Sequence, residues 1–233
     1  MKSIADLSAR ERDEMYGLLS YYFANTSRRQ FECDLAEKDW VIILCDTATN
    51  SVQGFSTLMK QRLTVAGEPA VIFFSGDTII HREYWGETVL PKLWGRHVFG
   101  LADQIRDARV YWFLICSGYK TYRYLPLFFR EFYPNHGRPT PPHVKRMLDQ
   151  IGQFKFGDEY DSDGGVIRFQ RASPLQSGVA EITPQRLTDP HVAFFISANP
   201  GHGEGDELAC LAELSRDNLT SAGVRLVGPP AAT

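Results

Sequence analysis

The sequence predicts a mixed α/β fold in which helices flank a central sheet. Short apolar runs, such as residues 40–46 and 109–116, have the length and composition of buried strands. Longer segments, such as residues 88–106, repeat apolar side chains every three to four positions, as amphipathic helices do. Neither an internal repeat nor a shift in composition divides the 233 residues. We therefore expect one domain, formed mainly by residues 1–200, to which residues 201–233 add a loop, a helix and a frayed tail.

The composition excludes several classes of protein. The chain has 25 lysines and arginines against 28 aspartates and glutamates, which gives a net charge of −3 and an isoelectric point near 6.1. Binding to nucleic acid needs a positive surface that neutralises phosphates, so we expect no nucleic-acid partner. No apolar run approaches the roughly 18–20 residues of a membrane span, and the first residues lack a signal-peptide core. We therefore expect a cytoplasmic protein without a membrane span.

The cysteines and histidines do not form a metal-binding motif. The cysteines have no paired spacing, and we expect four buried free thiols in a reducing compartment. They are Cys33, Cys45, Cys116 and Cys210. Four of the histidines also lack ligand spacing with a cysteine or a carboxylate. These are His136, His143, His191 and His202. We therefore expect no metal.

The first third of the chain is expected to form two helices and a three-stranded meander. Ser8 and Glu11 have the spacing of a capping box, which opens a helix over residues 8–26. A shorter helix follows it. The strands are predicted over residues 40–46, 52–63 and 70–81. Gly76 interrupts the third strand, and a glycine within a strand suggests a bulge or a close backbone approach.

The rest of the chain alternates between the two element types. A long helix is predicted over residues 88–106, and it must begin near Gly86–Thr88 because Pro91 is tolerated only in the first turn. The strand 109–116 is of the buried, central kind. Beyond it we predict helices over residues 122–134, 143–151 and 207–214, and strands over residues 166–170 and 191–198.

This order of elements resembles the GNAT (N-acetyltransferase-like) acyltransferase superfamily, of which the chain looks like a divergent member. The resemblance covers roughly residues 8–200. It is carried by the Gly76-interrupted strand 70–81, by the turn HREYWGET (81–88) that opens the long helix, by the strand 109–116 and by the aromatic segment ending FFREFYP. It implies a GNAT-like mixed central sheet with a splayed strand pair flanked by helices, in which the opening between the splayed strands receives the pantetheine arm of coenzyme A (CoA).

The resemblance implies an acyltransferase that moves an acyl group from a CoA or carrier-protein thioester to a small amine or hydroxyl acceptor. The implied cosubstrate is acetyl-CoA or a longer acyl-CoA, and the expected partner is the small-molecule acceptor. The sequence leaves open whether the chain forms a homodimer. The alternative is a catalytically inactive GNAT-like module for ligand binding or assembly.

The turn after the interrupted strand is the implied donor site, because helix starts bind anions through free backbone N–H groups. The implied contacts with CoA are Arg82, Tyr84, Trp85, Gly86, Thr88 and, after the strand 109–116, Ser117. The turn departs from the family pattern (Gln/Arg)xxGx(Gly/Ala), since it keeps only an arginine and one glycine. Glu87 carries the wrong charge for an anion. The segment LFFREFY (127–133) puts Phe128 where the family has a tyrosine.

Acyl transfer needs a base that takes a proton from the acceptor, and often an acid for the leaving thiolate. Asp77 and His81 are the candidate bases on the strand 70–81, and we favour His81 because histidine titrates near neutral pH. Strand alternation places both residues on one face. Tyr124 is the candidate acid, with Tyr122 as the alternative. Each of these residues also has an ordinary structural interpretation, as a polar strand end or as a core tyrosine.

Two further segments have simpler interpretations. The aromatic side chains between Tyr111 and Tyr133 are most often core in such a pattern, although they also suit a wide apolar pocket for a longer acyl chain. The glycine-rich stretch 199–206 matches no nucleotide-binding fingerprint, and its acidic residues would repel phosphate. We therefore expect a flexible loop there.

Overall fold

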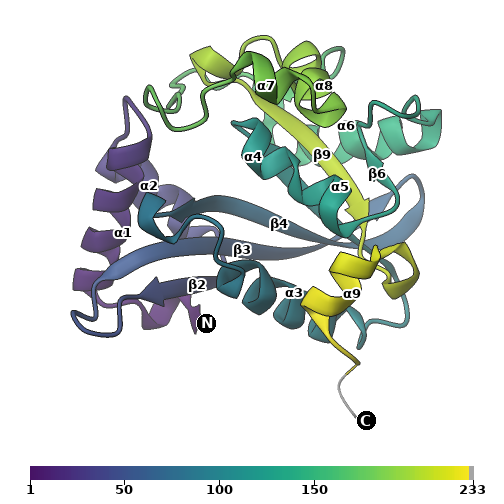
Figure 1. Cartoon of the computed structure of the whole chain (residues 1–233). Helices are drawn as coiled ribbons and strands as arrows, with labels where there is room; N and C mark the ends of the chain where they lie inside the picture. The colour runs from purple at the N-terminus through teal and green to yellow at the C-terminus, as the bar shows by residue number, and fades with distance from the viewer. Residues whose placement is uncertain (231–233) are drawn as a thin grey trace.

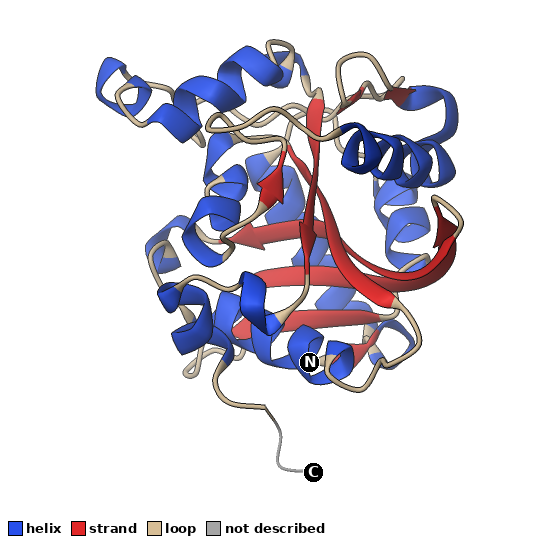
Figure 2. Cartoon of the chain, turned by 90° about the vertical axis from the view of Figure 1, so that its right-hand side faces the viewer, coloured by secondary structure: helices blue, strands red, loops and turns tan. Residues whose placement is uncertain are grey.

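The computed structural model describes residues 1–230 and shows a nine-stranded mixed sheet with helices on both faces (Figure 1 and Figure 2). The strand order is β1-β2-β3-β4-β5-β9-β8-β7, and β6 pairs with β9 outside this path. Figure 2 shows how strongly the sheet twists along its length. None of the described helices is long and apolar enough to cross a membrane.

The N-terminal elements follow the sequence prediction. Helix α1 opens with the predicted capping box, in which Ser8 and Glu11 exchange hydrogen bonds, and α2 is capped by Ser27. The strands β2, β3 and β4 form an antiparallel meander, and β1 adds a short edge to β2. The bounds are β1 (Lys2–Ser3), α1 (Ala9–Tyr22), α2 (Arg28–Ala36), β2 (Trp40–Cys45), β3 (Val52–Val65), β4 (Glu68–Ile80) and α3 (Val89–Ala102).

The centre of the sheet contains the predicted parallel pair. Strand β5 (Arg109–Cys116) runs parallel to β4, and α3 forms the crossover between them. The pairing extends from Ala70↔Arg109 to Ser75↔Leu114 and stops there, although both strands continue. The two strands therefore diverge beyond Ser75. This topology confirms the predicted fold class, a GNAT-like mixed central sheet with a splayed strand pair flanked by helices.

A bulge in β4 marks the point of divergence. The register between β3 and β4 shifts between Ser56↔Thr78 and Leu58↔Ser75. Two residues of β4, Gly76 and Asp77, consequently face the single residue Thr57 of β3. An extra residue of this kind bends its strand and increases the local twist. The interruption at Gly76 that the sequence indicated is therefore a bulge.

The C-terminal half adds four strands, β6 to β9, and several helices. Strand β9 lies between β5 and β8. Figure 1 shows α3, α5 and α9 packed on the same side of the sheet. The bounds are α4 (Tyr119–Tyr122), α5 (Tyr124–Phe128), β6 (Phe132–Tyr133), α6 (Pro142–Phe156), β7 (Tyr160–Asp161), β8 (Val166–Ile167), α7 (Pro184–Leu187), α8 (Pro190–Ala198), β9 (Glu207–Glu213) and α9 (Ser221–Val227).

Two predicted elements have the opposite type. Residues 191–198 are helix α8, whose start is marked by Pro190 in the first turn and by Asp189, which caps the His191 N–H. Residues 207–213 are strand β9, not a helix, because a strand buried on both faces is as apolar as a buried helix and the two cannot be told apart by periodicity.

Other boundaries were also wrong. The aromatic helix ends at Phe128, and the long helix ends at Ala102. Residues 223–227 of the predicted frayed tail 223–233 belong to helix α9, while residues 231–233 lie outside the described residues.

The core has two sides. On one side, which we call the α3 face, α3, α5, α8 and α9 pack on the sheet. On the other, the α1–α6 face, α1 and α2 cover β2 and β3 while α6 covers β4, β5 and β9. The aromatic residues of the 111–133 span are mostly buried in these cores, which confirms their structural interpretation. Cys116 and Cys210 are buried, whereas Cys33 and Cys45 are exposed, so the prediction of four buried thiols was wrong for two of them.

Ser75, the last paired residue of β4, is tied to two tryptophans. Its hydroxyl oxygen accepts a hydrogen bond from the indole N–H of Trp94 in α3 at 3.0 Å and from that of Trp112 in β5 at 2.9 Å. All three side chains are buried. The two indole rings lie 4.5 Å apart between centroids. One hydroxyl therefore fixes α3 and β5 to β4 where the strands part.

We predict that Ser75→Ala destabilises the fold more than an equivalent change elsewhere in the sheet. It removes the acceptor for two buried indole N–H groups, and each unsatisfied buried donor costs about 1–3 kcal/mol, so the free energy of unfolding should fall by about 2–5 kcal/mol. Ser56→Ala is the control, because the buried Ser56 hydroxyl has a single partner, Thr78. Urea denaturation measures both. Equal losses in the two variants would contradict the role given to Ser75.

Candidate functional site

Three polar side chains meet where β4 and β5 diverge. The register Cys116↔Leu208 between β5 and β9 brings Ser117 opposite Glu207 at the next position. Alternation along each strand puts both residues on the α1–α6 face, to which Phe113 and Ala209 also contribute. Asp77 lies on the same face, as its electrostatic contact with Lys38 after α2 indicates. Asp77, Ser117 and Glu207 thus form a polar site, which we call the opening.

Gly76 is required by the close approach of two side chains to the bulge. A Cβ atom at this position would lie 2.6 Å from Thr57 Oγ1 and 2.8 Å from Lys38 Cε. The Lys38 side chain is buried, with 5% of its surface exposed. Thr57 is also buried, and its hydroxyl has no hydrogen-bond partner among the described residues. Because Gly76 has no side chain, Lys38 can approach the bulge. The Thr57 hydroxyl lies beside the bulge without a partner among the described residues.

Burial changes the proton affinity of both carboxyl groups in the opening. Loss of solvent raises the pKa of Asp77 to about 6, against the opposing charge of Lys38. Loss of solvent also raises the pKa of Glu207 to about 8, aided by the negative charge of Asp77 and opposed by a hydrogen bond from Ser117. At neutral pH the pair therefore holds one proton, on Glu207, while Asp77 is ionised. Two carboxyl groups with separated pKa values are the arrangement from which acid and base roles arise.

His81 lies elsewhere. It follows the end of β4, where its ring packs against Tyr21 and Tyr22 of α1 with centroid separations of 6.1 and 6.4 Å. Its Nδ1 atom lies 3.8 Å from a carboxylate oxygen of Glu83. The structure therefore places His81 against α1, four residues beyond Asp77, while Asp77 belongs to the opening.

The candidate acids lie on the α3 face. Tyr122 is buried among aromatic residues and donates its hydroxyl hydrogen bond to the Pro134 carbonyl at 2.9 Å, so it has a structural role. Tyr124 begins α5 and stacks on Phe128, with ring centroids 5.8 Å apart. Burial raises the pKa of Tyr124, which keeps its phenol protonated. Tyr124 remains the candidate acid of the two.

The turn that precedes α3 uses part of its backbone internally. The amides of Tyr84, Trp85 and Glu87 donate to carbonyls three residues earlier. The amide of Arg82 donates to the Tyr22 hydroxyl at 2.7 Å, and its guanidinium donates to the Tyr21 hydroxyl. Gly86 adopts a φ of +98°, a conformation that favours glycine.

Four amides at the start of α3 have no acceptor among the described residues. They belong to Gly86, Thr88, Val89 and Leu90. The first N–H groups of a helix are a ready anion site. The start of α3 therefore offers free amides to an anion, whereas the amides at the centre of the turn are already bonded.

Two side chains of the turn face other partners. Tyr84 donates its hydroxyl hydrogen bond to Asp46 at 3.2 Å. Trp85 donates its indole N–H to the Ile80 carbonyl at 2.8 Å, and the ammonium of Lys120 lies 3.5 Å from the centre of the Trp85 ring. Lys120 also donates to the Val179 carbonyl at 2.6 Å. These contacts link the turn, α4 and the segment 174–180 at the mouth of the divergence.

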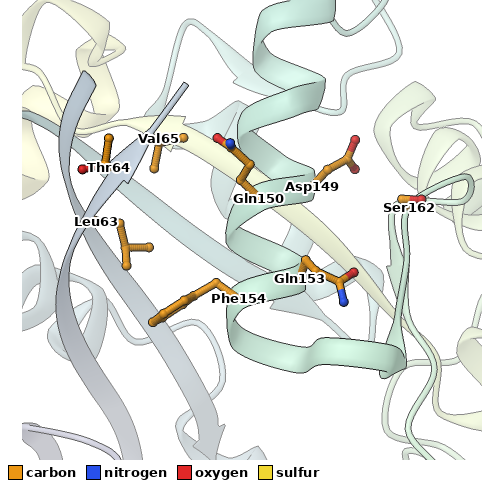
Figure 3. A pocket seen from close by; sticks show the side chains of 8 residues that line it. All are labelled: Leu63, Thr64, Val65, Asp149, Gln150, Gln153, Phe154 and Ser162. Atoms are coloured by element: carbon orange, nitrogen blue, oxygen red, sulfur yellow. The ribbon is translucent and has the colours of Figure 1, made fainter. Parts of the chain in front are cut away.

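Two surface pockets lie away from the opening. The first pocket, of about 550 Å³, lies between Leu63 and Val65 at the end of β3 and Gln150 and Phe154 of α6 (Figure 3). The other, of about 430 Å³, lies around Arg109 at the opposite end of β5 from Ser117. Neither pocket is lined by a residue of the opening or of the turn before α3.

Three residues at or beside the opening, Glu207, Lys38 and Thr57, were not identified from the sequence. Glu207 was assigned to a helix, and the strand β9 that presents it was not recognised. Lys38 and Thr57 carry no local signal, since each is a single polar residue in an ordinary pattern. The one usable clue was Gly76, because a glycine within a strand indicates close approach of another group.

We predict that Glu207→Gln changes how stability depends on pH. A carboxyl group whose pKa is raised by folding contributes stability below its ordinary pKa, and this contribution is lost as the pH rises towards about 8. The free energy of unfolding of the wild type should therefore fall between about pH 5 and pH 8 relative to that of the variant. Glu204→Gln in the exposed loop is the control and should follow the wild type. Parallel curves for all three proteins would show that Glu207 is solvated.

Comparison with known proteins gives a limited likeness. No family model matches the sequence, and no curated protein sequence does. A probable N-acyltransferase from Enterococcus faecalis, described as a conserved protein of unknown function, is 18% identical, with a TM-score of 0.41 over 54% of this chain and 31% of that one. An acetyltransferase from Trypanosoma brucei is 18% identical, with a TM-score of 0.28 over 36% of this chain and 62% of that one. The chain spans less than two thirds of either structure. We therefore base the function on the geometry of the opening alone.

Proposed function

We propose that the chain is an acyltransferase, which moves an acyl group from a CoA thioester to a small amine or hydroxyl acceptor with Asp77 as the base. One observation carries this proposal. The only parallel strand pair of the described sheet separates at a bulge, and the bulge presents an ionised carboxylate to the opening. Where the two strands separate, their unpaired backbone groups lie beside the half-buried Asp77 carboxylate.

Asp77 suits the role of base better than His81. Its pKa of about 6 leaves it ionised at neutral pH and still able to take up a proton, which is the balance that general base catalysis requires. It lies within the opening, whereas His81 packs on α1. The acceptor would lose its proton to the Asp77 carboxylate as it attacks the acyl carbon, and the bond from that carbon to the CoA sulfur would then break, so that CoA leaves as a thiolate that takes up a proton. Ser117 and the protonated Glu207 offer hydrogen bonds to the acceptor from β5 and β9.

The donor would be held at the start of α3. The free amides of Thr88, Val89 and Leu90 and the guanidinium of Arg82 supply the positive potential that a diphosphate needs. CoA supplies the activated acyl group when bound. The chain itself orients the acceptor and takes its proton.

The second candidate is a GNAT-like module that binds a ligand without catalysis. The internal hydrogen bonds of the turn favour it, because three of its amides are unavailable to a phosphate. Titration with CoA, acetyl-CoA and longer acyl-CoAs, followed by melting temperature, tests donor binding, since a ligand of the native state raises it. Release of free thiol with a panel of amines and alcohols then tests catalysis. Binding without thiol release would support the module, and binding of neither donor nor product would overturn both.

We predict that Asp77→Asn lowers the rate of acyl transfer by about 10²–10⁴-fold, the usual contribution of a positioned base. The wild-type rate should rise with pH as Asp77 ionises near pH 6. Affinity for CoA should remain unchanged. His81→Ala is the paired variant, and the two decide between the bases. A fully active Asp77→Asn together with an inactive His81→Ala would return the role to His81.

We predict that Arg82→Glu weakens CoA binding, and more strongly at low salt than at high salt. The contact is ionic and exposed, and it is screened when the Debye length falls from about 30 Å at 0.01 M to about 8 Å at 0.15 M ionic strength. Calorimetric titration at both ionic strengths measures the effect. Arg106→Glu near the far end of α3 is the control for net charge. An equal loss in both variants would place the donor away from the turn before α3.

A further inference from the structure

Lys38 is a buried cation for which the fold makes room. It follows α2, and its side chain crosses to β4, where its Cε atom would be 2.8 Å from a Cβ at residue 76. Only a glycine allows this approach without displacement of the lysine. A buried ammonium is costly, because its charge loses the solvation of water. Because the buried ammonium lies beside a bulge that presents the Asp77 carboxylate, we expect the two charges to interact.

The contacts of Lys38 leave most of its charge uncompensated. Its ammonium donates to the Asp34 carbonyl at 2.8 Å, and the nearest oxygen of the Glu37 carboxylate is 3.8 Å away. Among the described residues, no carboxylate lies closer. Glu37 is also shared, since it pairs with Lys155 of α6. The charge of Lys38 is therefore available to Asp77 across the gap at Gly76.

Every packed element around Asp77 contributes a polar or charged group. Lys38 favours the ionised form of Asp77, and Asp34 of α2 disfavours it. Glu207 of β9 faces Asp77 and is hydrogen-bonded by Ser117 after β5. Burial lowers the pKa of Lys38, and the charge of Lys155 in α6 lowers it further. Lys38 is thus the group that opposes burial and Asp34 at the Asp77 carboxylate.

We propose that Lys38 is a positioning residue that keeps Asp77 ionised through the gap left by Gly76. The catalytic importance of Lys38 rests on the proposed role of Asp77 as a base. The effect of Lys38 on the ionisation of Asp77 is expected in the protein without ligand. Without the cation, desolvation and Asp34 would act unopposed, and Asp77 would become a proton donor at neutral pH. The same bulge therefore sets both the place and the charge of the base.

Lys38→Met tests this directly, because methionine keeps the length of the side chain and suits a buried site. Loss of a nearby opposite charge typically raises the pKa of an aspartate by about 1–3 units. Lys155→Met is the matched control, because its ammonium lies 5.5 Å from the centre of the Phe74 ring, as that of Lys38 does. Lys38→Gln serves as a second neutral variant if the methionine variant does not fold.

The first measurement uses the protein without ligand. Carbon-13 NMR follows the titration of the Asp77 carboxyl group, whose signal is identified by its loss in Asp77→Asn. We expect its midpoint to rise by about 1–3 units in Lys38→Met and to stay near the wild-type value in Lys155→Met. An unchanged midpoint in Lys38→Met, or an equal shift in both variants, would overturn the proposal. This result does not depend on whether the chain transfers acyl groups.

The second measurement is the pH dependence of thiol release. We expect the acidic limb of Lys38→Met to move to higher pH by the same amount, with the rate regained at high pH. A structural defect would instead lower the rate at every pH and leave the limb in place, which would contradict the proposal. If no acceptor supports thiol release, the proposed function fails while the NMR titration still decides the role of Lys38.

Discussion

The architecture of the site depends on a single buried hydroxyl group. Ser75 accepts hydrogen bonds from Trp94 of α3 and Trp112 of β5. Because both indoles are buried, each needs this acceptor, and the oxygen can satisfy both only where β4, β5 and α3 meet. The parallel pairing ends at this residue, and the bulge follows immediately. The tryptophan contacts therefore determine where the strands separate and which residue of β4 enters the opening.

Electrostatics in the opening follow from this geometry. The bulge turns Asp77 towards the α1–α6 face, where burial raises the pKa of the carboxyl group and Lys38 restrains the rise. Glu207 has no cation among the groups that shift its pKa, and it is consequently the carboxyl group that keeps its proton. Asp77 of β4 and Glu207 of β9 therefore have different charges at neutral pH, although both belong to the opening. Their difference comes from a lysine that reaches one of them through the space at Gly76.

Much of the fold was predictable from local patterns, but the site was predictable only in part. The capping box at Ser8, the strand 109–116 and the interruption at Gly76 are local signals, and each has the predicted outcome. The segments 191–198 and 207–213 are short and apolar on all sides, so periodicity could not distinguish helix from strand there. Because the second segment was predicted as a helix, Glu207 was not recognised as a candidate site residue.

Lys38 and Thr57 could not be found from the sequence for a different reason. They reach Asp77 from α2 and β3 through tertiary packing, and no local pattern records such an approach. The preference for His81 over Asp77 at the level of sequence considered only the ordinary pKa of histidine. The structure shows instead that burial brings an aspartate into the neutral range. A sequence argument about a base therefore has to include the desolvation that only the fold reveals.

The unusual turn before α3 and the segment 174–180 are best understood together. Pro174 and Gln176 exchange backbone hydrogen bonds with Ala24 and Tyr22 after α1, each at 2.8 Å, and Val179 accepts from Lys120. This segment therefore runs from the end of α1 to the start of α4, beside the separated strand ends. Trp85, which stands where related turns have a small residue, provides the aromatic surface on which Lys120 rests.

The same substitution explains why the turn differs from the family pattern. A large indole in the turn donates to the Ile80 carbonyl, one of the β4 backbone groups that the loss of pairing with β5 leaves free. The Trp85 indole thus bonds a carbonyl that the divergence of β4 and β5 leaves free. The amides of Tyr84, Trp85 and Glu87 donate to carbonyls three residues earlier. The N–H groups at the first turn of α3 have no partner among the described residues, because they begin the helix and the Thr88 side chain does not cap them. The departures of the turn from the pattern (Gln/Arg)xxGx(Gly/Ala) therefore leave the start of α3, rather than the turn itself, as the place with free backbone donors.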